Sequence, residues 1–313
     1  MAKLRRAFSF LLSAGNRTWI ALLLGSLGIA IGIMLLRPTP DLLSPNPEPG
    51  QVSRASPEVL LWMIIYCTQI AFYLVALAPA WRLLLENRRY FPANWPKIVF
   101  PVIGLVIFIV GVPVVTVRSL IPDIFSVMPN TSGMERWTWV LLGIVGIPTA
   151  MGALLADVGL RSVDSGNERK EDAIRLYLGF RDCLQQSLWI SGAGLGLTIL
   201  SAGAVRQIHI SLDHLWFSPL YTLEYGAVYS IILVLFYAPM YSRLIGVGRR
   251  LCESLVPLPL PDSQQWAEAC SKRKDLEELL QVNTTVRANL QGGAAILTPL
   301  LGGIVSNLLP GAG

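Results

Sequence analysis

The segment Val59–Trp81 reads VLLWMIIYCTQIAFYLVALAPAW and contains no aspartate, glutamate, lysine, arginine or histidine. A helix needs about 20 mostly apolar residues to cross the hydrocarbon core of a bilayer, which is roughly 30 Å thick. This segment reaches that length with one amide side chain, Gln69, near its middle. It therefore predicts a membrane-spanning helix.

Six further apolar runs of similar character follow the same pattern. They are Trp19–Leu36, Ile98–Val117, Trp137–Ala156, Ser187–Val205, Leu220–Ile245 and Leu290–Leu309. The sequence thus predicts an all-α polytopic membrane protein with about seven transmembrane helices. The last run is rich in glycine and contains Pro299, so a re-entrant or surface-lying segment is the alternative there.

The composition of the whole chain agrees with a membrane protein. Of the 313 residues, 53% are hydrophobic and 14% are charged, and the mean hydropathy is +0.54. Soluble domains are about a quarter charged, so this chain has too few charges to cover a surface in water. Because the basic residues follow the membrane topology, the net charge of +5 does not indicate a nucleic-acid partner.

The basic residues also predict the orientation of the chain. Of the 25 lysines and arginines, 20 lie before the first apolar run, between the second and third, between the fourth and fifth, or between the sixth and seventh. Such alternation is what the positive-inside rule predicts for seven spans. We therefore expect a cytoplasmic N-terminus and a C-terminus outside.

The predicted spans divide the chain into four parts. Residues 1–18 form a cytoplasmic N-terminal segment, and residues 19–255 hold the first six spans with short loops. A cleavable signal is not expected at the start, because the apolar run at 7–14 is short and no small-residue cleavage site follows the next run. We expect a short interfacial helix at 7–14 instead. Residues 288–313 hold the seventh span.

The remaining part, residues 256–287, is predicted to be a cytoplasmic strap and helix. The strap is the proline-rich sequence VPLPLP at 256–261, and the helix has apolar residues at helical spacing, among them Trp266, Leu276 and Leu279. This helix could pack beneath its own bundle, contact a partner or another subunit, or bind anionic lipid through the basic residues 272–274.

Motifs of catalysis and metal binding are absent from the sequence. The four cysteines form no CxxC pair, and the only histidines, His209 and His214, make with Asp213 an incomplete zinc site. We find no phosphate-binding loop, no nucleophile elbow and no metalloprotease motif. The sequence therefore predicts neither a metal nor a cofactor, and it does not favour an enzyme.

Four residues are the candidates for a pore or polar site. Glu224 lies about one turn inside the outer end of the sixth run beside Tyr225, and the two could form a mouth that attracts cations or an ordinary interfacial belt. Gln69, with Thr198 of the fifth run, is the polar residue nearest the midplane. Asp157 lies at the inner border of the fourth run, where a solvated helix end is the simplest interpretation.

Glycine pairs spaced as GxxxG occur in two runs, Gly28 with Gly32 and Gly192 with Gly196. Small residues let helices approach closely in lipid, so these faces predict packing within the bundle or a subunit interface.

Three function classes remain after these observations. The first is an oligomeric channel or membrane effector, and the second is a non-catalytic assembly or sensor subunit that acts through its cytoplasmic helices. A membrane-embedded enzyme or carrier is disfavoured, because no ionisable residue lies at mid-membrane depth. The expected partners are the lipid bilayer and either further copies of the chain or partner membrane subunits. Short loops and the lack of a eukaryotic targeting signal favour a bacterial inner membrane.

Overall fold

The structure is a computed structural model that describes residues 57–87, 131–164, 170–211, 220–258, 266–282 and 286–308. Nearly all of these residues are helical, which confirms the all-α class. The helices within these ranges are α3 (Pro57–Asn87), α5 (Thr131–Asp164), α6 (Lys170–Ser211), α7 (Leu220–Leu255), α8 (Trp266–Leu280) and α9 (Val286–Leu308).

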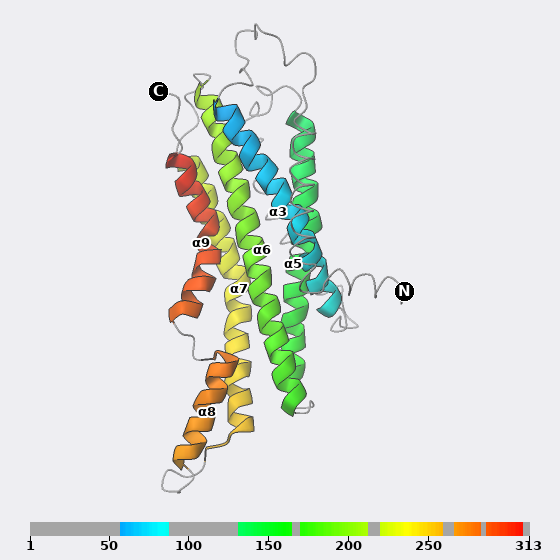
Figure 1. Ribbon diagram of the computed structural model, residues 1–313, viewed down its shortest axis with the longest axis vertical. Coiled ribbons are helices and arrows are strands. Elements are labelled where there is room, and N and C mark those ends of the chain that lie inside the picture. Colours follow the sequence, from blue (N-terminus) through cyan, green and yellow to red (C-terminus); the bar gives the residue numbers. More distant parts are fainter. Residues whose placement is uncertain are drawn as a thin grey trace, which may run out of the picture.

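Four of these helices, α3, α5, α6 and α7, are long and apolar enough to cross a membrane. They contain the second, fourth, fifth and sixth predicted spans, and they run alongside one another in Figure 1. The predicted spans at 19–36 and 98–117, the N-terminal segment 1–18 and strap residues 259–261 lie outside the described residues.

The seventh predicted span corresponds to α9. Its apolar part, Gly293–Leu308, is shorter than the four long spans and than the about 20 residues that a full crossing needs. The helix nevertheless packs against both α6 and α7, on the side of the bundle away from α5 (Figure 1). One face of α9 therefore packs on the bundle, while its other face exposes Leu297, Leu301 and Val305.

The longest helix, α6, lies at the centre of the bundle and contacts α3, α5, α7 and α9. It has 42 residues, which at 1.5 Å per residue gives about 63 Å, roughly twice the thickness of the hydrocarbon core. The charged segment that begins at Lys170 continues without a break into the apolar segment. The charged half therefore extends beyond the apolar part of the bundle.

Glycines allow α9 to lie very close to its two neighbours. A Cβ atom on Gly192 or Gly203 of α6 would overlap with Ala295 or Ser306 of α9. On the other side, a Cβ on Gly303 would come within 2.6 Å of the Thr222 carbonyl oxygen of α7. The glycine face of the fifth predicted span is thus used for packing within this chain.

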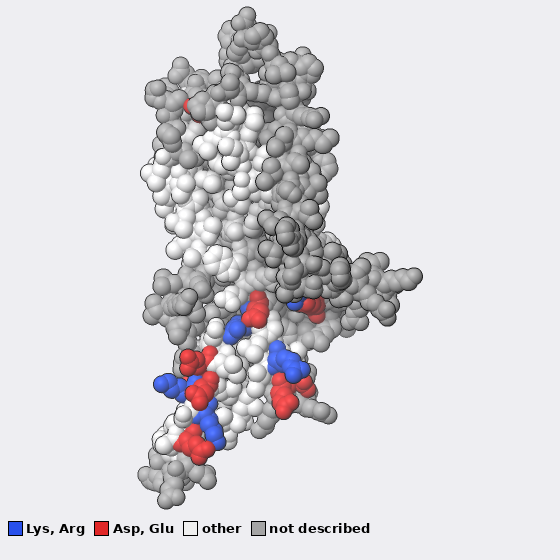
Figure 2. Space-filling view, viewed as in Figure 1, with Lys and Arg blue, Asp and Glu red and all other residues white. Residues whose placement is uncertain are grey.

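Charged side chains of the described surface gather toward the end of the bundle that carries α8 (Figure 2). The apolar middle of the bundle instead exposes large hydrophobic side chains such as Ile64, Val228, Ile231 and Leu301. A surface of this kind is suited to lipid rather than to water.

The amphipathic helix predicted after the sixth span is α8, and its C-terminal end is closed by a Schellman motif. Gln281 has a positive φ of 53°, and its backbone N–H donates to the Glu278 carbonyl at 3.0 Å. The N–H of Val282 donates to the Glu277 carbonyl at 3.0 Å, and the Val282 side chain is buried. This motif ends α8 at its C-terminal side.

We expect Gly192→Ala to destabilise the protein by ~1–3 kcal/mol, because the added methyl group would overlap with the Ala295 carbonyl and overpack the α6–α9 contact. The measurement is the thermal unfolding midpoint in detergent. Gly143→Ala is the matched control, since a Cβ there meets nothing within 4 Å and alanine favours a helix over glycine by ~1 kcal/mol. Equal loss of stability in both variants would contradict this packing.

Candidate functional site

The four predicted polar-site residues lie at different places in the bundle. Gln69 is 1% exposed and faces α6, while Asp157 is buried near the α8 end and faces α7. Glu224 is exposed near the start of α7, and Tyr225 is half-buried and packs against the main hydrophobic core. The structure therefore does not bring these residues together into one site.

A stripe of small and hydroxyl-bearing residues runs along the central helix instead. Its members follow one another at intervals of four, three, four and three residues, which places them on one face of a helix. We call it the α6 polar seam, and it consists of Ser187, Ser191, Gly194, Thr198 and Ser201. The seam lies within the apolar part of α6 and faces α3, α5 and α7.

Gln69 and Tyr73, one turn apart on α3, contact the seam at Thr198. The Gln69 Nε2 group donates to Thr198 Oγ1 at 3.0 Å, and the Tyr73 hydroxyl lies 2.9 Å from the same oxygen. Thr198 in turn donates to the Gly194 carbonyl of its own helix at 2.9 Å. Gln69 and Tyr73 are both buried, so this cluster joins α3 to α6 in the absence of bulk water.

A second hydroxyl cluster joins α5, α6 and α7 on the same seam. The Tyr237 hydroxyl of α7 lies 2.6 Å from Ser187 Oγ and 3.1 Å from Ser191 Oγ. Ser187 also donates to the Thr149 carbonyl of α5 at 3.1 Å. Hydrogen bonds between helices specify their register in a bilayer, where each contributes ~0.6 kcal/mol on average.

Asp157 forms an ion pair with Arg243, which links α5 to α7. Its side chain is only 10% exposed, so its interpretation as a solvated helix end is wrong. Arg161, one turn away on α5, has a guanidinium nitrogen 3.9 Å from the same carboxylate oxygen. The Arg243 side chain is 40% exposed, so the pair lies at the border between buried and solvated groups.

A third polar cluster lies at the end of the bundle opposite α8, where the C-terminal parts of α6 and α9 meet the N-terminal part of α7 (Figure 1). Asn307 Oδ1 of α9 accepts from Arg206 and from Thr222, both at 3.4 Å. The Ser306 hydroxyl lies 3.0 Å from the Thr222 hydroxyl. The carbonyl end of a helix favours a cation, so the buried Arg206 stabilises the last turn of α9.

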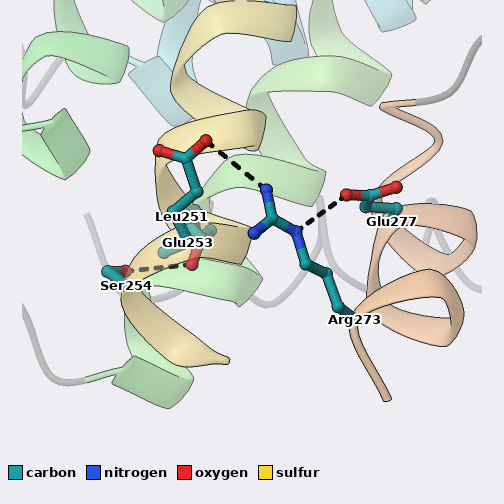
Figure 3. Close-up of polar contacts among 5 residues, drawn as sticks. All are labelled: Leu251, Glu253, Ser254, Arg273 and Glu277. Atoms are coloured by element: carbon teal, nitrogen blue, oxygen red, sulfur yellow. Dashed lines mark hydrogen bonds and ion pairs between the residues drawn. The ribbon is translucent and has the colours of Figure 1, made fainter. Parts of the chain in front are cut away.

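The partner-contact candidates are all on α8, which is held against α7 by Arg273. Figure 3 shows the Arg273 guanidinium between two carboxylates, Glu253 of α7 at 3.4 Å and Glu277 of α8 at 3.1 Å. Arg273, which interrupts the apolar pattern in the sequence, therefore adds a polar link between α8 and α7 through Glu253.

The apolar face of α8 is directed mostly at its own bundle. Leu276 packs against the main hydrophobic core, and Leu280 is fully buried in it. Trp266 is half-buried, whereas Leu279 is 57% exposed. Of the three predicted contact residues, Leu279 thus offers the most surface to a partner.

A cluster able to hold a metal ion does not occur among the described residues. No group of three or more histidine, cysteine, aspartate or glutamate side chains lies close enough there to hold a metal ion. Asp213 and His214 lie outside the described residues, as does the side chain of His209. Comparisons with protein families, with curated proteins and with solved structures found no match.

Sequence reasoning singled out Gln69 and Thr198 for their depth, and the structure brings the two into hydrogen-bond contact. It missed the partners Tyr73 and Tyr237, because tyrosine in an apolar run reads as an ordinary hydrophobic or interfacial residue. The four-three spacing of the seam was a usable signal, since it marks one helix face before any contact is known.

We expect Arg243→Gln to destabilise the protein more than Asp157→Asn. The first change leaves a buried carboxylate without its main partner, whereas the second leaves an arginine that reaches solvent. The losses of unfolding free energy in the two variants should differ by on the order of 1–2 kcal/mol, which lies between the free energies typical of exposed and of buried ion pairs. Thermal unfolding of both single variants and the double variant gives the coupling free energy.

The control for this cycle is Arg82→Gln, which removes the largely exposed pair with Glu86. That pair should contribute under ~1 kcal/mol. A double-variant cycle with no coupling between Asp157 and Arg243 would contradict the importance of their contact.

Proposed function

We propose that the chain crosses the bilayer about seven times, with its N-terminus in the cytoplasm and its C-terminus outside, in a bacterial inner membrane. The alternation of basic residues along the sequence supports this orientation. The described charges gather at the α8 end, and α8 follows the sixth predicted span, so this arrangement agrees with the proposed orientation (Figure 2).

We propose that the protein is an oligomeric channel or membrane effector whose path follows the α6 polar seam. The observation that carries this proposal is the contact of Gln69 and Tyr73 with Thr198, a polar contact without charge inside an apolar bundle. Passive pores have weakly polar walls, whereas proton-coupled carriers need ionisable groups at depth. Within the described ranges, the apolar middle of the helices contains no such charge.

The seam is closed in this conformation, because Ser187, Gln69 and Tyr73 are almost fully buried. Opening would require α3 to separate from α6, and the hydrogen bonds to Thr198 resist that separation. A hydrogen bond contributes ~1 kcal/mol net, so losing one shifts such an equilibrium by roughly fivefold.

We expect Thr198→Val to raise ion flux by roughly fivefold for each of the two hydrogen bonds lost, because it removes the acceptor of both α3 side chains and weakens the closed contact. The measurement is flux from liposomes that contain the purified protein, over a panel of salts, with empty liposomes as the blank. The matched control is Thr298→Val on α9, since the Thr298 hydroxyl donates only within its own helix to the Ala294 carbonyl at 2.8 Å.

In the same assay, Glu224→Gln should lower the preference for cations over anions.

Equal flux from Thr198→Val, Thr298→Val and the unchanged protein would remove the seam from the path. An unchanged preference for cations over anions in Glu224→Gln would show that Glu224 does not line the entrance of the path. If the unchanged protein gave no ion flux with any salt of the panel, the result would favour the second candidate function.

The second candidate is a non-catalytic assembly or sensor subunit that acts through α8. The observation in its favour is that Arg273 pairs α8 with α7 while Leu279 of α8 remains exposed. A helix held in one place, with an apolar residue directed away from its own core, is suited to contact a partner membrane subunit.

We expect Leu279→Asp to shift the detergent-solubilised protein to a smaller species in size-exclusion chromatography, without a change in its unfolding midpoint. The exposed leucine contributes little to its own fold, so only a subunit contact would respond. Leu276→Asp is the comparison, because Leu276 packs against the core and its loss should lower stability. An unchanged elution volume for Leu279→Asp would exclude this subunit contact.

A further inference from the structure

The two hydroxyl clusters on the α6 polar seam differ in how completely their hydrogen-bonding groups are paired. In the cluster around Tyr237, Ser187 donates its only proton to the Thr149 carbonyl. The contact between Tyr237 and Ser187 therefore requires Tyr237 to donate, and the contact between Ser191 and Tyr237 requires Ser191 to donate. Each of the three hydroxyl protons therefore has an acceptor, and the relay ends on a backbone carbonyl. The hydroxyl protons of this cluster therefore need no additional hydrogen-bond partner.

The cluster around Gln69 is not closed in the same way. Thr198 gives its single proton to the Gly194 carbonyl, so its oxygen accepts from both Tyr73 and Gln69. All the hydroxyl protons are then used, and none is left for the amide oxygen of Gln69. That oxygen, Oε1, is buried and has no hydrogen-bond partner.

Reversing the Gln69 amide does not remove this deficit. If Oε1 faced Thr198, the amide nitrogen with its two protons would take the place where the oxygen now has no partner. One unpaired acceptor would be exchanged for two unpaired donors. The orientation with the nitrogen toward Thr198 is therefore the better one, and it leaves one acceptor open.

We propose that Gln69 Oε1 accepts a hydrogen bond from a bound, neutral donor, which is either a water molecule or a hydroxyl or amide group of a small solute. The donor is neutral because the apolar middle of the described helices provides no carboxylate to pair with a cation. Buried polar groups in lipid are paired, and buried waters fill sites that offer two or more polar partners. The Tyr73 hydroxyl oxygen, which has only a 3.5 Å contact from Gln69, supplies a second acceptor beside Oε1.

The site lies between α3 and α6, where Gln69 and Tyr73 meet Gly194 and Thr198. It is a binding site in its own right and does not depend on ion flux. If the liposomes showed no ion flux, the proposed channel function would fail but the proposed binding site at Gln69 would not. The two proposals can therefore be tested separately.

The test uses hydroxyl-radical labelling by X-ray radiolysis of the full-length protein in ¹⁸O-water, read by mass spectrometry at single residues. Water bound beside a buried side chain generates radicals in place, so Tyr73 should be labelled several-fold faster than Tyr237. Tyr237 is the matched control, because it is a buried tyrosine in a cluster where no buried side-chain oxygen lacks a partner. Gln69→Leu should reduce the labelling of Tyr73 to that of Tyr237.

Native mass spectrometry distinguishes the two sources of the donor. A small-molecule adduct that is lost in Gln69→Leu, together with slow labelling of Tyr73, would identify a solute. Slow labelling of Tyr73 without an adduct, with a higher unfolding midpoint for Gln69→Leu, would overturn the proposal, since removing an unpaired buried amide stabilises a protein. Gln69→Met, of closely similar volume, replaces Gln69→Leu if the leucine variant does not fold.

Discussion

In the interior of a bilayer, a polar group has no water to bind and must find its partner within the protein. The described bundle meets this constraint through α6, which contacts α3, α5, α7 and α9. One face of α6 carries the polar seam, and a second carries Gly192 and Gly196, which lie against α9. The positions of the other long helices follow from these two faces, since each neighbour contributes either a polar side chain or a close backbone.

The polar contacts are graded along the length of the bundle. Ion pairs occur at the α8 end, where Asp157 meets Arg243 and Arg273 meets Glu253. In the apolar middle the described contacts between helices are made by hydroxyl and amide groups such as Thr198 and Gln69. Desolvation explains the gradient, because burying a charge costs far more than burying a hydroxyl group that keeps a hydrogen bond.

The sequence predicted the parts of the fold that depend on length and hydropathy. The apolar runs at 59–81, 137–156, 187–205 and 220–245 all lie in long helices. Side-chain partners could not be predicted in the same way, because one helix does not specify which neighbour it meets. Asp157 illustrates the limit, since its burial depends on Arg243, which is 86 positions away in the sequence.

The use of glycine within the chain also restricts how copies of the protein can associate. The face at Gly192 and Gly196 is covered by α9, so it is not available to a second subunit. Among the candidate spans, α7 has the least buried apolar segment, and its Ile231 and Leu235 project outward, with Leu235 70% exposed. Large side chains on such a face can pack against lipid or against another protein at similar energy, because lipid tails are as apolar as leucine. An oligomer built on α7 would therefore be held by packing shape rather than by hydrophobic burial, and its stability would depend on the lipid that surrounds it.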